Sequence, residues 1–87
     1  MTLQQKYPSI GSPAVYSIQV IGQLDKSWSN RLGGLTITST ILDDQQAISS
    51  LQGTLIDQAA LFGVLMALYD LRLPLLSVQC LRGSNQQ

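Results

Sequence analysis

The residues with the greatest potential for chemistry lie in one short segment. Residues 24–31, Leu-Asp-Lys-Ser-Trp-Ser-Asn-Arg, hold the only tryptophan and three of the ten charged side chains. An aromatic ring close to a guanidinium group is typical of surfaces that bind a partner or a ligand. Asp25, Trp28 and Arg31 are therefore the candidate ligand-binding residues. The alternative is that Trp28 closes one end of the hydrophobic core while Arg31 extends past it into solvent.

The residue types that most enzymes use are missing. The chain has no histidine and no glutamate, and Cys80 is its single cysteine. This composition excludes the usual zinc sites and histidine-activated nucleophiles. Residues 51–54 lack the glycine spacing and the lysine of a phosphate-binding loop. Asp43-Asp44 falls in a predicted hairpin turn, where aspartate commonly serves turn geometry. We therefore expect no catalytic residues, no metal, no cofactor and no enzymatic activity.

Charge and cysteine content bear on partners and compartment. Five basic residues balance five acidic ones, so the attraction to phosphate backbones is missing and nucleic-acid binding is not expected. Near-zero net charge also removes the repulsion that opposes self-association. Residues 1–13 lack the apolar stretch of a secretory signal, and the longest apolar run, 59–69, is too short to cross a membrane. We predict a cytoplasmic location, with Cys80 as a small buried hydrophobe.

The periodicity of apolar residues predicts an α+β fold with the order β-β-β-α-β. Strands are expected over 16–24, 35–42, 47–56 and 75–81, and a helix over 58–71. Apolar residues at alternate positions face inward, namely Tyr16, Ile18, Val20, Leu24, Leu35, Ile37, Ile41, Leu51 and Leu55. Asp57 is the expected N-cap of the helix, and Pro74 ends it. The predicted architecture is an antiparallel meander plus one helix packed on a four-stranded sheet.

The domain boundaries and the strand order follow from the same pattern. Residues 1–14 are predicted as a flexible lead-in, 15–82 as a single α+β domain and 83–87 as a polar tail. A helix-linked return to a parallel neighbour gives the order 4-1-2-3. The last strand has apolar residues on both faces, which favours the interior of the sheet.

The predicted helix is apolar or small almost all round. Leu61, Val64, Leu65, Leu68 and Leu71 form the stripe that covers the sheet. The rest of its surface has one charge, Asp70, and nothing in a chain of this length is left to cover it. We predict a homo-oligomer, a dimer or higher, whose interface comprises Ala59, Phe62, Gly63, Met66, Ala67 and Tyr69. The alternative is that a loop or the N-terminal segment folds over this face.

The sequence resembles a group of small uncharacterised bacterial proteins. The resemblance covers most of residues 16–78, and its most specific part is Asp-Gln-Ala-Ala-Leu (57–61) followed by Asp-Leu-Arg-Leu-Pro-Leu-Leu-Ser-Val (70–78). In that group a histidine often stands where this chain has Phe62. A function that depends on that histidine would therefore be absent here. The group has no assigned activity, so the resemblance supports the fold and not a function.

Two functional hypotheses remain. The first is a self-associating interaction or regulatory module without catalysis. The second is a small-molecule-binding protein that uses the Trp28/Arg31 loop or a cleft between subunits.

Overall fold

The structure is a computed structural model that describes residues 9–42 and 45–83. The predicted turn at Asp43-Asp44, the first eight residues of the lead-in and residues 84–87 of the tail lie outside these ranges. Along the chain the elements are β1 (Ala14–Ile21), the 3-10 helix η1 (Lys26–Arg31), β2 (Thr36–Ile41), β3 (Ala47–Leu55), α1 (Gln58–Asp70) and β4 (Leu75–Gly83). The α+β class with one main helix on a four-stranded sheet is confirmed.

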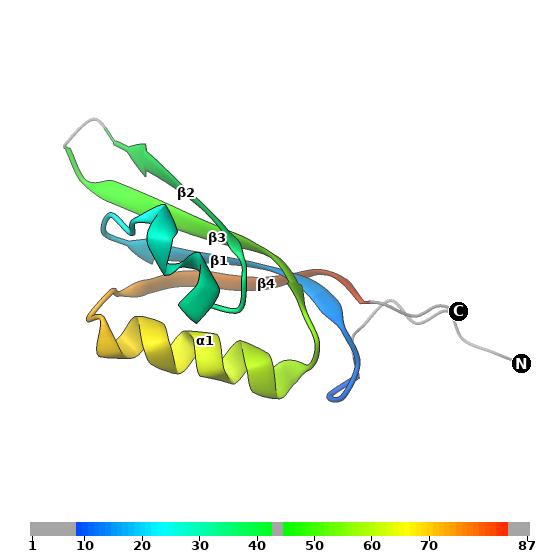
Figure 1. Ribbon diagram of the computed structural model, residues 1–87. Helices are drawn as coiled ribbons and strands as arrows, with labels where there is room; N and C mark the ends of the chain where they lie inside the picture. Colours follow the sequence, from blue (N-terminus) through cyan, green and yellow to red (C-terminus); the bar gives the residue numbers. More distant parts are fainter. Residues whose placement is uncertain (1–8, 43–44, 84–87) are drawn as a thin grey trace, which may run out of the picture.

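The sheet has the strand order β2-β3-β1-β4, and every neighbouring pair is antiparallel (Figure 1). The chain passes from β1 through η1 to β2, and β3 lies between these two strands in the sheet. It then passes from β3 through α1 to β4, and β1 lies between those two strands. This is the split βαβ arrangement of ferredoxin-like folds, with the first helix reduced to a 3-10 segment.

The predicted order 4-1-2-3 is wrong, because β3 and not β2 pairs with β1. The predicted parallel return is also wrong, since β4 runs antiparallel to β1. The physical reason lies in residues 25–34. Their composition suggests a local turn, but they form a crossover over one face of the sheet, and this leaves room for β3 to pair with β1 (Figure 1).

The core lies between the sheet and the two helical segments, which share one face (Figure 1). All predicted inward residues of β1 and β3 are buried, as are Leu24, Leu35 and Ile37. Ile41 is the exception at 57% exposure, because the last residues of β2 project beyond the helices (Figure 1). The opposite face of the sheet is polar, with Thr36, Thr38 and Gln52 exposed to solvent.

Local hydrogen bonds fix both ends of α1. The Ala60 N–H donates to Asp57 Oδ1 at 2.8 Å, which confirms the predicted N-cap. At the other end, Arg72 N–H donates to the Tyr69 carbonyl and Leu73 N–H to the Leu68 carbonyl. With Arg72 at φ 64°, these two bonds form a Schellman motif. The motif reverses the chain so that β4 begins close to the end of the helix.

β4 is an edge strand, so the prediction of an interior strand is wrong. Apolar residues on both faces of a strand favour burial, but only β1 lies beside this one. Cys80 is accordingly exposed, and the prediction that it is a small buried hydrophobe is also wrong. The apolar side chains of β4 are therefore exposed to solvent in a single copy of the chain.

Candidate functional site

A buried serine holds the start of the segment that carries Trp28. Ser49 on β3 is fully buried, and its Oγ donates to the Gly22 carbonyl at 2.7 Å and accepts from the Leu24 N–H at 2.9 Å. Ser39 Oγ lies 3.0 Å from the same hydroxyl. Gly22 has a φ of +122°, which disfavours any residue with a Cβ. Ser49 thus fixes the point where the chain leaves β1 for η1.

Replacing Ser49 with alanine is expected to lower the free energy of unfolding by about 1–3 kcal/mol, because the partly buried Gly22 carbonyl and the buried Leu24 N–H lose their partner. Urea denaturation followed by Trp28 fluorescence measures this. Ser50→Ala, at a half-buried position on the polar face of the sheet, is the control and should change stability by less than about 0.5 kcal/mol. Equal effects of the two substitutions would contradict the anchoring role.

The structure brings two of the three predicted ligand-binding residues together. The Arg31 guanidinium carbon lies 5.3 Å from the centroid of the Trp28 ring, a cation–π distance. Trp28 is half-buried and packs against the core. Asp25 instead accepts a hydrogen bond from Ser27 Oγ at 2.8 Å at the start of η1. Ser27, Trp28 and Arg31 line an open hollow of about 300 Å³.

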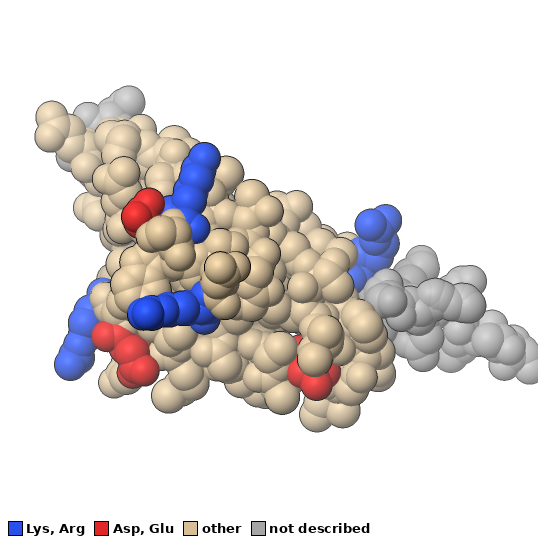
Figure 2. All heavy atoms as spheres, viewed as in Figure 1, with Lys and Arg blue, Asp and Glu red and all other residues tan. Residues whose placement is uncertain are grey.

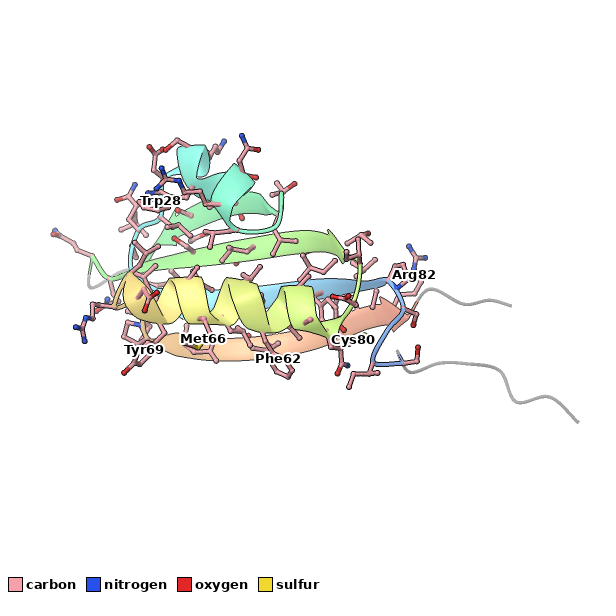
Figure 3. All side chains as sticks on the ribbon, turned by 60° about the horizontal axis from the view of Figure 1, so that its bottom comes forward. Trp28, Phe62, Met66, Tyr69, Cys80 and Arg82 are labelled. Atoms are coloured by element: carbon pink, nitrogen blue, oxygen red, sulfur yellow. The ribbon has the colours of Figure 1, made fainter. Side chains whose placement is uncertain are left out.

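The outer side of α1 carries a row of exposed large side chains. Phe62, Met66 and Tyr69 are 59%, 59% and 68% exposed. Figure 3 shows all three along the flank of the helix nearest β4. Leu61, Val64 and Leu68 are buried against the sheet, as predicted, while Leu65 and Leu71 are partly buried and pack against the core.

β4 continues this exposed row. Leu75, Val78 and Cys80 pair with Val20, Ile18 and Tyr16 of β1. Directly paired residues share a face of the sheet, and those three β1 residues are buried on the face that α1 covers. Leu75 and Val78 are nevertheless 53% and 36% exposed, because they lie at the edge of the sheet.

Helix flank and strand edge thus form one continuous apolar surface. We call it the α1–β4 surface, and it consists of Phe62, Met66, Tyr69, Leu75, Val78 and Cys80. A groove of about 280 Å³ joins its two parts where the end of α1 meets the start of β4, and Tyr69 and Leu75 are among its lining residues. Within residues 9–42 and 45–83, the charged side chains are scattered and form no cluster of one sign in the view of Figure 2.

The other three residues of the predicted interface lie elsewhere on the helix. Ala59 and Gly63 are exposed, whereas Ala67 is half-buried and packs against the core. The contribution of β4 to the surface was not predicted from the sequence. Its signal was the run of apolar residues on both faces of the strand, which suits an uncovered edge with a partner as well as it suits an interior strand.

Gly63→Ala is expected to stabilise the chain by about 0.5–1 kcal/mol, because alanine favours the helix and a Cβ at this position meets nothing within 4 Å. Thermal unfolding measures the gain. Subunit affinity should stay the same, since Gly63 lies outside the α1–β4 surface. Weaker association of this variant would place Gly63 in a subunit contact.

Two further features of the described residues bear on function. No three side chains from His, Cys, Asp or Glu gather there as metal ligands. In the same residues, no helix combines the length and apolar character that a bilayer crossing requires.

Comparison with known families gives one match. The sequence model of a family described as "Domain of unknown function (DUF8691)" matches residues 15–79, which is most of the chain. The chain belongs to this family. The DUF8691 match begins in β1 and ends at Gln79 in β4, so α1 and parts of all four strands lie within the family domain. No significant match to a curated protein or a solved structure was found.

Proposed function

We propose that the protein is a small self-associating interaction module without catalysis, and that copies meet through the α1–β4 surface. The observation that carries this proposal is the continuity of exposed apolar side chains from the flank of α1 onto edge strand β4. Large contiguous apolar patches on small proteins commonly mark interaction sites. A regulatory role would follow if association controls access to another protein.

The size of the α1–β4 surface supports a specific contact. Its five largest side chains are between about one third and two thirds exposed, which leaves on the order of 500 Å² of apolar area per copy. The backbone of β4 adds to this area. A standard interface buries about 800 Å² per partner, so these side chains alone supply more than half of that area.

Native mass spectrometry of the full chain tests the proposal, because it counts subunits and detects retained small molecules in one spectrum. We expect an oligomer without extra mass. A monomer at every concentration tested would overturn the proposal.

The second candidate function is binding of a small molecule at Trp28 and Arg31. The position of the Arg31 guanidinium over the Trp28 ring, beside an open hollow, favours it. Titration with anionic or aromatic metabolites should then change Trp28 fluorescence, and Arg31→Ala should abolish the change. Unchanged fluorescence across such a set would count against this candidate.

A further inference from the structure

The free edge of β4 differs from the free edge on the other side of the sheet. β2, at the opposite edge, presents Thr36, Thr38, Ser39 and Thr40 as exposed hydroxyl residues. β4 presents apolar residues and, from Leu75 to Leu81, no charge. Soluble proteins usually protect an edge strand with charges, especially lysine, or with proline. Neither β2 nor residues 75–81 of β4 carry a charge or a proline, but the exposed residues of β2 are mostly polar, whereas those of β4 are mostly apolar.

The backbone of Val78 points toward this open edge. The Ile21 N–H donates to the Pro74 carbonyl at 2.8 Å, so the backbone N–H and C=O groups of Ile21 point toward β4. The direction of these groups alternates from one residue of a strand to the next, so the backbone groups of Ile18 point toward β3. Val78 is opposite Ile18, and it therefore directs both backbone groups away from β1. These groups are available to another strand.

The sequence of β4 is self-complementary around this residue. From 75 to 81 it reads Leu-Leu-Ser-Val-Gln-Cys-Leu. Polar residues stand one position on either side of Val78, and apolar residues stand at two and three positions on either side. An antiparallel pair of identical strands related by a two-fold axis places each residue opposite its mirror position. With the axis at Val78, polar residues meet polar residues and apolar residues meet apolar residues.

The pairing of β4 with β1 shows which part of β4 is a regular strand that could pair with a second copy. The register of the β1–β4 pairing shifts between Val15 and Tyr16 and between Gln19 and Val20. Between these two irregularities, residues 77–80 pair without a shift, and Val78 lies inside that stretch.

We infer that two copies join through antiparallel pairing of β4 with β4, centred on Val78. This inference rests on the proposed function and specifies its partner and geometry. The two four-stranded sheets become one sheet of eight strands, and the α1 helices lie on the same face. Phe62, Met66 and Tyr69 of the two copies then line the space between the helices, above the joined strands.

The first test replaces Val78 with proline in the full chain. Proline removes the outward N–H donor and is tolerated at an edge position whose N–H faces solvent. Each copy loses a central donor, so we expect the dissociation constant to rise at least about 30-fold. Analytical ultracentrifugation measures this change, and far-UV circular dichroism checks that the fold is retained.

Ile41→Pro is the matched control on the opposite edge. The Leu42 N–H donates to the Gln46 carbonyl toward β3, so the Ile41 N–H points to the open edge of β2. We expect this variant to associate like the unmodified chain. If Ile41→Pro weakens association as much as Val78→Pro does, pairing through β4 is contradicted.

The second test remains valid even if the proline variant does not fold. Val78→Cys in a Cys80→Ser background places two thiols opposite each other at the axis, about 5.5 Å apart between Cα atoms, which a disulfide can bridge. We expect a covalent dimer under mild oxidation, and none from Ile41→Cys in the same background.

An oligomer that persists in Val78→Pro, together with no disulfide cross-link in the Val78→Cys variant, would overturn strand pairing. The proposed function would survive that result if a charge at Phe62 still dissociates the oligomer. A chain that is monomeric throughout would overturn both.

Discussion

Replacing Phe62 with glutamate is expected to raise the dissociation constant of the oligomer at least about 100-fold. Loss of the buried ring costs about 1.5–3 kcal/mol, and an unpaired carboxylate placed in an apolar contact adds to that cost. Every 1.4 kcal/mol corresponds to a factor of about ten in the dissociation constant. Stability of the isolated chain should change little, because the side chain is exposed within one copy. Analytical ultracentrifugation across a concentration series measures the effect.

Ile41→Glu is the matched control for this substitution. Ile41 has nearly the same exposure as Phe62, 57% against 59%, but it lies on β2 at the opposite edge of the sheet. We expect Ile41→Glu to associate as the unmodified chain does. If Phe62→Glu leaves the oligomer intact, the helix flank takes no part in the contact.

Replacing Ile18 with alanine is expected to lower the free energy of unfolding by about 3–4 kcal/mol, because it removes three buried heavy atoms and leaves a cavity. Ile18 is fully buried at the centre of β1, between Leu51 on β3 and Val78 on β4. A domain of 87 residues has a total stability of about 4–13 kcal/mol, so a loss of this size removes at least about a quarter of it.

Urea denaturation followed by circular dichroism at one fixed protein concentration measures the loss, since dissociation would otherwise shift the midpoint. Ile18→Val is the conservative control and should cost about 0.5–1.5 kcal/mol. Ile41→Ala should cost less than about 0.5 kcal/mol because its side chain is largely exposed. A loss below about 1 kcal/mol for Ile18→Ala would contradict the central packing role of this residue.

Local structure could be predicted from the sequence where one residue pattern has one physical meaning. Alternation of apolar and polar residues identified the buried face of β1 and β3, and Asp57 before an apolar run identified the start of α1. These features depend on neighbours within a few residues along the chain.

Strand order and edge position could not be predicted in the same way. Residues 25–34 lack periodicity, so their composition does not reveal that they cross over a strand. The apolar residues of β4 are compatible with two environments, a second neighbouring strand or a partner molecule. Only the pairing of β1 with both β3 and β4 shows that β1 has no free side left for β2. Because β4 pairs with β1 alone, β4 lies at the edge. The part of the α1–β4 surface that lies on α1 could therefore be predicted from the sequence, and the part that lies on β4 could not.

Hydrogen exchange of the full chain, followed by mass spectrometry at high and low protein concentration, tests self-association through the α1–β4 surface most directly. We predict that peptides covering β4 exchange more slowly at high concentration, because Val78 and its neighbours gain partners there. Peptides covering β2 should exchange at the same rate at both concentrations. Protection that is independent of concentration, or that increases at β2 and not at β4, would contradict the account.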